Sequence, residues 1–426
     1  MTTATVTDLP RLLPKDGQSA QDWRAHTARY DRIPYRNTAG ALIKDIQLSG
    51  LTGRGGAAFP VHRKLAAVLD AATKKRVRPA VVANGAESEP ASDKDATLLW
   101  LAPHLVLDGL QLVAEVVGAE SAVLYTHADR AGDVGRRLRQ ALNERREDRV
   151  PVRLAIAPPR FLAGQETALV NHLGGGPAIP TFPLPRITER GLENVPTLVQ
   201  NAETLAHVAL IARRGPRWFR EVGTRKEPGS FLATVRRADG RPRIVEVPLG
   251  IPVTEALGGL TQETAVLIGG YHGTWVPAAQ AAKLRLDNES LHAVGASVGA
   301  GVVVALPGDR CGIVESARIV RYLALESAGQ CGPCLNGLPR MSAALTAVAR
   351  GRAPAQALAD LGRWAGLVTG RGACHHPDGT ARFVASALRA FAPELDRHAR
   401  GRCGAANATP FLPVPDSVAR TEEDWL

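Results

Sequence analysis

Apolar residues in the first half of the chain alternate between short continuous runs and longer segments with helical spacing. Continuous runs occupy residues 80–83, 122–126 and 152–157, and helical spacing separates them at residues 97–118 and up to about residue 149. Short apolar runs are typical of buried parallel strands, and the intervening helices cover the faces of such a sheet. The pattern therefore predicts an α/β domain.

The pattern changes near residue 229. Short strands are predicted at residues 231–237, 244–247 and 265–268, with turns between them and one helix at residues 253–257. This arrangement indicates a small β-grasp-like module. We interpret residues 277–309, which include a glycine-rich stretch, as a connecting segment.

Helical spacing dominates the last quarter of the chain. Helices are predicted at residues 313–325, 338–349, 355–365 and 381–391, and their short links favour a helical bundle. Residues 1–40 lack such patterns, and we interpret them as a lead-in arm. The segment from residue 404 to the end is predicted to be extended and to contact a neighbouring protein.

Composition narrows the classes of function. The 426 residues are 45% hydrophobic and carry a formal charge of +11, so a large core is possible and the partners should be acidic. Basic residues are dispersed and only 4% of residues are aromatic, which argues against nucleic-acid binding. No apolar stretch has the length of a signal peptide core or a membrane span, so we expect a cytoplasmic protein. Its five cysteines should then be metal ligands or free thiols.

A glycine loop is the strongest candidate for a cofactor site. Residues 50–60 read GLTGRGGAAFP, with four glycines in seven positions and Arg54 among them, and helical spacing follows. Backbone N–H groups in such a loop can form an anion-binding nest at the start of a helix. Lys64, one turn into that helix, favours a phosphate. A surface loop without a ligand is the competing interpretation.

Further polar and aromatic residues follow the predicted strands. Glu87 and Glu89 come directly after the strand at residues 80–83, where α/β sheets bind ligands, and they could accept hydrogen bonds from ribityl, ribose or amide groups. Capping of the next helix is the alternative role. Phe182 could stack on a planar ring or simply pack on the surface. Asn201 and Thr204 lie one helical turn apart in residues 196–208.

Three cysteines form a candidate metal site. Cys331 and Cys334 are a C-x-x-C pair at a predicted helix start, and Cys374 is a plausible third ligand, followed by His375 and His376. A thioredoxin-type redox pair, a zinc site and an iron–sulfur site all compete, although the helical context disfavours the first. Cys311 and Cys403 show no partner pattern, and we expect each to be a buried small residue or a free thiol.

Taken together, the motifs resemble a known family, the NADH-binding, FMN-containing subunit of bacterial respiratory complex I, which is also found in NAD-reducing hydrogenases and formate dehydrogenases. The resemblance spans about residues 40–395. It rests on an ordered set of motifs: GLTGRGGAAFP with Lys64, NGAESEP with Lys94 and Asp95, AGQETALVNHLGG, Phe182-Pro183, PTLVQNAETL, ESAGQCGPCLNGLP and ACHHP.

The resemblance implies a Rossmann-like flavin domain, a ubiquitin-like β-grasp insert of the SLBB type and a helical bundle that holds a [4Fe-4S] cluster. We place the arm at residues 1–40, the FMN and NADH domain at 41–228, the β-grasp domain with its connector at 229–309, the iron–sulfur bundle at 310–403 and the tail at 404–426. In that family NADH passes a hydride to FMN, which releases single electrons to the cluster.

The resemblance also implies roles for individual residues. The positions that match the FMN environment are Gly53, Arg54, Gly55, Gly56, Lys64, Asn84, Glu87, Gly164, Glu166, Asn201 and Thr204. The positions that match the NADH site are Phe59, Glu89 and Phe182. Glu87 and Glu89 are also assigned as catalytic, and Cys331, Cys334 and Cys374 as cluster ligands.

Several positions depart from the family pattern. Ala328 replaces the first of four cluster cysteines, so the cluster is expected to be [3Fe-4S] or a [4Fe-4S] with a non-cysteine ligand. Near the flavin, Phe161, Gln165 and Gln200 replace a tyrosine, a glutamate and an asparagine, while Ala86 and Ile179 replace an aspartate and a common lysine. We expect an NADH:acceptor oxidoreductase that delivers electrons to a ferredoxin or a companion redox subunit. The alternative is a degenerate, non-catalytic homologue that binds a cofactor or partner structurally.

Overall fold

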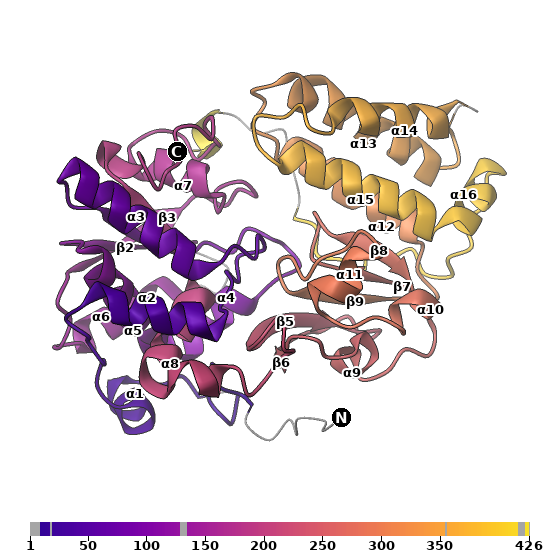
Figure 1. Ribbon diagram of the computed structural model, residues 1–426. Helices are drawn as coiled ribbons and strands as arrows, with labels where there is room; N and C mark the ends of the chain where they lie inside the picture. The colour runs from indigo at the N-terminus through magenta and orange to yellow at the C-terminus, as the bar shows by residue number, and fades with distance from the viewer. Residues whose placement is uncertain (1–8, 18, 128–133, 354–355, 416–421, 426) are drawn as a thin grey trace.

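The computed structural model describes residues 9–17, 19–127, 134–353, 356–415 and 422–425. Three units follow one another along the chain (Figure 1). A parallel sheet with helices on both faces forms the first, a mixed five-stranded sheet the second, and a group of helices packed above that sheet the third.

The first sheet is four-stranded and entirely parallel, which confirms the predicted α/β class. Its strands are β1 (Ala80–Gly85), β2 (Ala122–His127), β3 (Val152–Ala157) and β4 (Thr197–Asn201), in the order β3-β2-β1-β4. Its helices are α3 (Val61–Lys75), α6 (Val134–Glu144), α7 (Glu166–Leu173) and α8 (Ala202–Phe219), with a short turn of 3₁₀-helix at Leu192–Asn194. The helical spacing noted in residues 196–208 therefore begins only at Asn201, because the residues before it form β4.

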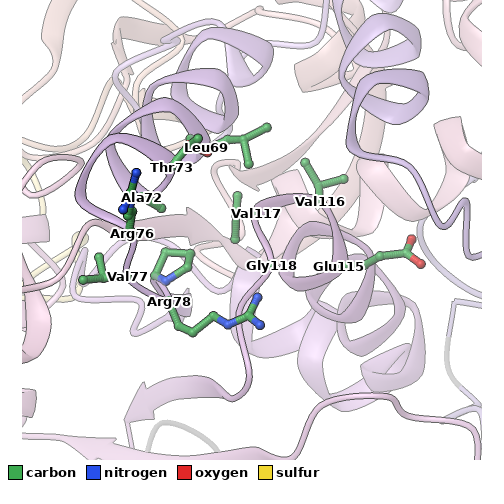
Figure 2. Close-up of a pocket in the computed structure, with 11 residues that line it drawn as sticks. Leu69, Ala72, Thr73, Arg76, Val77, Arg78, Glu115, Val116, Val117 and Gly118 are labelled. Atoms are coloured by element: carbon green, nitrogen blue, oxygen red, sulfur yellow. The ribbon is translucent and has the colours of Figure 1, made fainter.

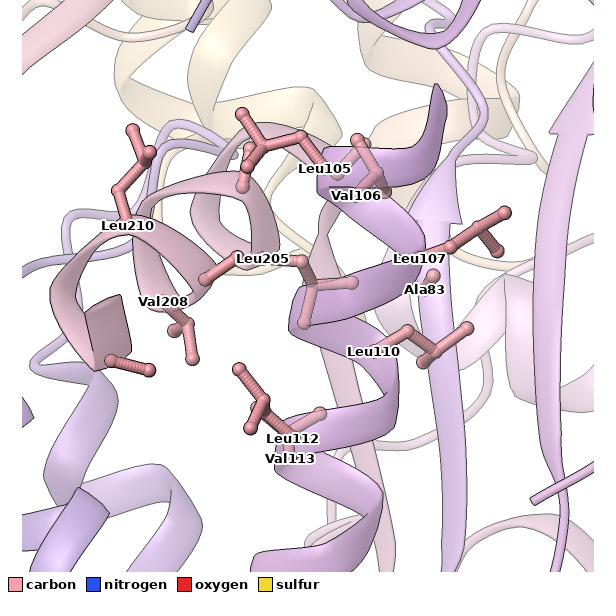
Figure 3. Packing of buried hydrophobic residues seen from close by; sticks show 14 of the residues in the cluster. Ala83, Leu105, Val106, Leu107, Leu110, Leu112, Val113, Leu205, Val208 and Leu210 are labelled. Atoms are coloured by element: carbon pink, nitrogen blue, oxygen red, sulfur yellow. The ribbon is translucent and has the colours of Figure 1, made fainter. Parts of the chain in front are cut away.

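The predicted helix at residues 97–118 is two helices, α4 (Lys94–Leu101) and α5 (Pro103–Val117), which meet at an angle of 95°. Pro103 cannot continue α4 because it lacks the N–H that the helix requires. Helix α5 is buried on nearly all sides between the sheet and α8 (Figure 3). Gly109 allows this close contact, since a Cβ there would lie 1.9 Å from the carbonyl oxygen of Leu205.

No single helix in the described ranges is long and apolar enough to cross a membrane, and only the bent pair α4 and α5 passes such a test together. The N-terminal segment is packed more closely than a simple arm. It includes α1 (Trp23–Tyr30) and α2 (Ala39–Ser49), and Leu12 and Leu13 are buried in the main core.

The second sheet is mixed. Its strands are β5 (Ser230–Arg236), β6 (Pro242–Pro248), β7 (Glu263–Ile268), β8 (Thr274–Pro277) and β9 (Val302–Pro307), in the order β6-β5-β9-β7-β8, with β5 and β9 parallel. Short helices lie at α9 (Val253–Leu257), α10 (Ala278–Ala281) and α11 (Asn288–His292). The interpretation of residues 277–309 as a connector is wrong, because they contain β9, a buried central strand.

The last unit contains α12 (Gly312–Leu325), α13 (Leu338–Ala349), α14 (Ala357–Val368), α15 (His376–Ala390) and α16 (Ala392–Ala399). A π-helical turn at Pro333–Gly337 leads into α13. The chain then runs back in extended form, and Phe411 and Leu412 donate backbone hydrogen bonds to Glu315 of α12 at 3.0 Å each. The last described residues, in a 3₁₀ turn at Glu422–Trp425, lie beside α7 (Figure 1).

Candidate functional site

A polar cleft opens at the carboxyl ends of β1 and β4. Asn84 and Asn201, the residues at which these strands end, are paired in register, and the chain runs from β1 to β2 on one side and from β3 to β4 on the other. Parallel α/β sheets bind ligands at such a switch in strand order. The cleft has a volume of about 160 Å³ and is lined by Arg54, Gly55, Asn84, Ala86, Glu87, Ser88, Glu89, Ser92, Lys94, Asp95, Gly164, Asn201 and Ala300.

The glycine loop forms one wall of this cleft and leads into α3, as predicted. The Gly53 N–H donates to the carbonyl of Phe59 at 2.9 Å and the Arg54 N–H to Thr204 Oγ1 at 2.9 Å, which fixes the loop against the start of α8. Within the described residues the exposed N–H groups of Gly55 and Gly56 have no acceptor. A Cβ at Gly55 would reach 3.3 Å from that of Asn201. The loop therefore offers free donors in a space that only glycine leaves open, which suits a phosphate group.

Arg54 is buried, and its guanidinium points toward the second sheet. Its Nε donates to the carbonyl of Ser230 at 3.2 Å and Nη1 donates to Thr52 Oγ1 at 3.0 Å. Burial lowers the pKa of Arg54, and Glu203 opposes that effect. Arg54 thus ties the glycine loop to β5 while its positive charge remains at the cleft.

Glu87 caps helix α4. Its carboxylate accepts hydrogen bonds from the N–H groups of Lys94 at 2.8 Å, Asp95 at 3.1 Å and Ala96 at 3.0 Å. Burial, followed by repulsion from Asp95, raises the pKa of Glu87. The helix-capping alternative considered from the sequence therefore describes what this side chain does, even though it lines the cleft.

Glu89 connects the cleft to the second sheet. Its Oε2 accepts from the N–H of Tyr271 at 2.8 Å and its Oε1 from the N–H of Ala91 at 3.1 Å. A Cβ at Gly270 would lie 2.5 Å from Glu89 Oε2, so a glycine is required where the two units meet. Glu89 is half-buried and its carboxylate edge reaches the cleft.

Beneath the cleft lies a buried charge cluster that the sequence did not reveal. Lys94 Nζ contacts Asp95 Oδ1 at 2.9 Å and Glu203 Oε2 at 2.8 Å, and Asn201 Nδ2 donates to Asp95 Oδ2 at 2.7 Å. Burial alone would lower the pKa of Lys94, but the surrounding carboxylates raise it. Burial would likewise raise the pKa of Glu203, but Lys94 and His207 lower it to about 2. The only advance signal was that Lys94, Asp95 and Glu203 fall within the quoted motifs.

The opposite wall of the cleft comes from the turn before α7. Asn84 Nδ2 donates to the carbonyl of Gly164 at 2.8 Å, and the Gly164 N–H donates to Ser88 Oγ at 3.1 Å. A Cβ on Gly164 would lie 2.6 Å from the carbonyl oxygen of Ala86, so this approach also requires glycine. Lys64 and Glu166, both matched to the flavin environment, form an ion pair between α3 and α7.

Two aromatic rings near these loops are unusually exposed. Phe59, at the end of the glycine loop, is 48% exposed, and Phe182, in the loop after α7, is 70% exposed. Large apolar side chains at a cleft margin suit stacking on a planar ligand.

The three cysteines of the candidate metal site lie close together, with Cys331 and Cys334 before α13 and Cys374 before α15. Burial, followed by the neighbouring Cys331 thiol and the Cys374 charge, raises the pKa of Cys334 to about 12. Among the described residues these sulfurs do not all lie within 4.8 Å of one another, whereas sulfurs bound to one zinc lie about 3.8 Å apart. The wider spacing fits a cluster better than a single zinc ion. Ala328 is half-buried and offers no ligand atom.

The largest cavity lies elsewhere. It is about 470 Å³, open to solvent, and sits between α3 and α5 at the amino-terminal end of β1 (Figure 2). Residues 76–79, with Arg76 and Arg78, form part of its lining. None of the predicted site residues lines it, and it faces the edge of the sheet opposite to the polar cleft.

Comparison with known proteins supports these assignments. The sequence family described as the Nuo51 FMN-binding domain matches residues 46–210, and the family described as the NADH-ubiquinone oxidoreductase-F iron-sulfur binding region matches residues 315–398. The first range contains the glycine loop, the cleft and the charge cluster. The second contains Cys331, Cys334 and Cys374.

Individual relatives agree. An F-type NADH-quinone oxidoreductase subunit of Rhizobium meliloti (strain 1021), the one numbered 2, is 30% identical over 384 residues, which cover 86% of this chain and 90% of the relative. The F-type counterpart in Streptomyces coelicolor is 29% identical over 394 residues, covering 88% and 86%. A chain of an NAD⁺-reducing [NiFe]-hydrogenase in the H₂-reduced state superposes with a TM-score of 0.74 at 26% identity, covering 84% of this chain. The alignment spans only 62% of the hydrogenase chain.

Proposed function

Because the chain belongs to the family of NADH-quinone oxidoreductase F subunits, we propose that it oxidises NADH with FMN and passes the electrons through an iron–sulfur cluster to a separate redox protein. The observation that carries this proposal is the cleft at the ends of β1 and β4. It combines free glycine N–H donors, a required glycine on each wall and a position at the switch in strand order.

The cleft residues fit a flavin nucleotide. We propose that the N–H groups of Gly55 and Gly56 hold its phosphate, and that Asn84 and Gly164 flank its ring system. Bound FMN would supply hydride acceptance and single-electron release, while the protein supplies orientation and electrostatics. Gly53, Arg54, Glu87, Asn201 and Thr204 hold the loops and helix starts in place around it, and the Lys64–Glu166 pair joins α3 to α7 at its edge.

We propose that Phe59 and Phe182 stack on NADH and that Glu89, at the cleft edge, orients the nicotinamide nucleotide. Glu87 keeps its assignment as a residue of the reaction centre, but its hydrogen bonds indicate a positioning role through α4. In this proposal the five-stranded unit is the β-grasp insert of the SLBB type. Its order β6-β5-β9-β7-β8, with parallel β5 and β9 at the centre, supports that assignment.

The helices α12–α16 form the proposed cluster-binding bundle, with Cys331, Cys334 and Cys374 as ligands. We keep the proposed domain boundaries at residues 41–228, 229–309 and 310–403. The electron acceptor is proposed to be a small acidic redox protein, such as a ferredoxin or a companion subunit. The charge of +11 would steer it, so its reduction should slow as ionic strength rises.

A non-catalytic role is the second candidate. One observation favours it, namely that Ala328 leaves the cluster with three cysteines. Such a homologue would bind FMN or a partner protein without transferring electrons.

A steady-state assay separates the two. The protein reconstituted with FMN should reduce an artificial one-electron acceptor when NADH is added. Phe182→Ala should raise the KM for NADH by roughly 2- to 10-fold through the loss of one stacking contact, with little change in stability. Leu367→Ala, at a residue that is 48% exposed on α14, serves as the matched control and should leave KM unchanged. Absence of NADH-dependent turnover in the FMN-loaded protein would contradict the oxidoreductase proposal.

A further inference from the structure

The two cysteines without a sequence pattern meet in space. Cys311, at the start of α12, and Cys403, four residues beyond the end of α16, lie beside His398 of α16. One ligand atom from each, two sulfurs and an imidazole nitrogen, lie within 4.8 Å of one another, and Cys311 Sγ is 3.2 Å from His398 Nε2. Among the described residues no other group of three His, Cys, Asp or Glu side chains converges in this way.

We infer that Cys311, His398 and Cys403 form a binding site for a thiophilic divalent cation of the zinc class. Two thiolates and one imidazole are a ligand set that zinc prefers, and their charges neutralise the ion. Sulfur and nitrogen ligands of one zinc lie about 3.5 to 3.8 Å apart, so the three atoms need only small shifts to bind it. The separation of His398 and Cys403 by four residues lies within the usual range for zinc ligands.

The surroundings of the three residues suit a metal. Cys311 and His398 are 6% and 3% exposed, whereas Cys403 is exposed, so an ion can enter from solvent and keep a water as its fourth ligand. The His398 ring is also hydrogen-bonded to the backbone of Val348 and Ala349 at the end of α13, which fixes its orientation. Ligating histidines commonly have such a second partner.

The backbone delivers Cys403 to this position through a tight turn. The N–H of Gly401 donates to the carbonyl of His398 at 3.0 Å, and Gly401 adopts a φ of +69°. The chain after Cys403 then returns along α12, where the Asn407 N–H donates to the carbonyl of Asp309 at 3.0 Å. A bound ion would therefore fasten α12, α16 and the C-terminal segment to one another.

This site is distinct from the proposed cluster site. Cys311 precedes α12 and Cys331 follows it, and a helix of 14 residues separates such positions by about 20 Å. The ion would thus be structural, and it would hold the end of the bundle that lies away from Cys331, Cys334 and Cys374.

Metal binding to the full-length chain tests the inference. Cys374→Ser removes a ligand from the other cysteine site, so the metal-free protein with this substitution should bind one Co²⁺ per chain and develop a thiolate-to-cobalt charge-transfer band. Adding Cys403→Ser should weaken Co²⁺ binding by at least roughly 100-fold, more than the loss of a second-shell partner costs. Arg402→Ala, at the exposed neighbouring residue, should leave the affinity unchanged.

Two results would overturn the inference. One is a cobalt band that is absent, or that does not respond to Cys403→Ser. The other is a thiol titration of the denatured, unreduced Cys374→Ser protein that finds two thiols per chain in place of four, because Cys311 and Cys403 would then form a disulfide. A zinc chelator should also lower the Tm of the zinc-loaded Cys374→Ser protein but not of the variant that also carries Cys403→Ser.

Discussion

Lys94 and Glu203 form an ion pair directly beneath the cofactor cleft, with 2.8 Å between Nζ and Oε2 and at most 4% of either side chain exposed. The pair joins the start of α4 to the first turn of α8. Glu203 Oε1 also accepts the backbone N–H of Leu232 in β5 at 2.9 Å. One buried charge pair therefore couples both walls of the cleft to the second sheet.

Loss of this lysine should be costly. Lys94→Met leaves Glu203 and Asp95 buried without their cation, and such a change typically costs about 3 to 5 kcal/mol of unfolding free energy. Chemical denaturation of the two proteins at neutral pH measures the difference.

The control is an exposed pair of the same type. Lys74 contacts Asp70 at 2.7 Å on the surface of α3, and Lys74→Met should cost no more than about 0.5 kcal/mol. Equal effects of the two substitutions would show that the buried pair has no special role.

Gly164→Ala should weaken FMN binding while the fold persists. The new Cβ would lie 2.6 Å from the carbonyl oxygen of Ala86 and 2.9 Å from Ser88 Oγ, so one wall of the cleft must move. Overpacking of this kind costs about 1 to 3 kcal/mol, or roughly 5- to 150-fold in the Kd for FMN. Quenching of FMN fluorescence by the apoprotein measures that Kd.

Gly40→Ala is the matched control, because nothing lies within 4 Å of a Cβ at this position in α2. It should leave FMN affinity unchanged. If both substitutions leave the Kd unaltered, FMN does not occupy the space between Gly164 and the glycine loop.

Acid should destabilise the first unit through His104. Burial, followed by the charges of His26 and Arg145, lowers the pKa of His104 from 6.5 to about 4. The unfolded chain binds a proton at this residue in a pH range where the native chain does not. The stability that His104 contributes is therefore complete above pH 6.5 and is lost as pH falls toward 4, by an amount on the order of 3 kcal/mol.

Replacing His104 with a side chain that does not titrate should remove this loss. The unfolding free energy of His104→Gln should fall less steeply between pH 6.5 and pH 4 than that of the wild type. His292→Gln, at an exposed histidine of α11, should retain the wild-type slope. Identical slopes in all three proteins would contradict the assigned pKa shift.

Ala328→Cys should complete the cluster site. The substitution supplies the fourth cysteine that the family pattern carries at this position, so the iron content of anaerobically purified protein should rise from about three to about four per chain. Iron and sulfide assays measure this change. An iron content that is the same with and without Cys at position 328 would show that another group already serves as the fourth ligand, or that no cluster is bound.

The periodic parts of the sequence predicted the fold well. The parallel strands β1, β2 and β3 and the helices α12 and α13 lie close to their expected ranges, since each has a strong apolar pattern of its own. Local patterns failed where the chain changes direction or where tertiary contacts decide. The Val302–Pro307 strand was hidden by the glycine-rich segment before it, and a proline divided the apolar run of α4 and α5.

The site shows the same division. Motifs identified the glycine loop, Asn84, Gly164 and Asn201, which the structure brings to one cleft. They did not indicate that Glu87 caps α4 or that Lys94 and Glu203 meet, because both facts depend on how α4 bends away from β1. The meeting of Cys311, His398 and Cys403 depends on the packing of α16 against α12, which no spacing in the sequence reveals.

The central claim is that electrons from NADH reach the cysteine site through the flavin cleft. Low-temperature EPR of anaerobically purified, FMN-loaded protein before and after addition of NADH tests it most directly. The account predicts that NADH bleaches the flavin absorbance and changes the iron–sulfur EPR signal, and that this change disappears in Cys331→Ser. A protein that contains FMN and iron but shows neither response to NADH would contradict the account.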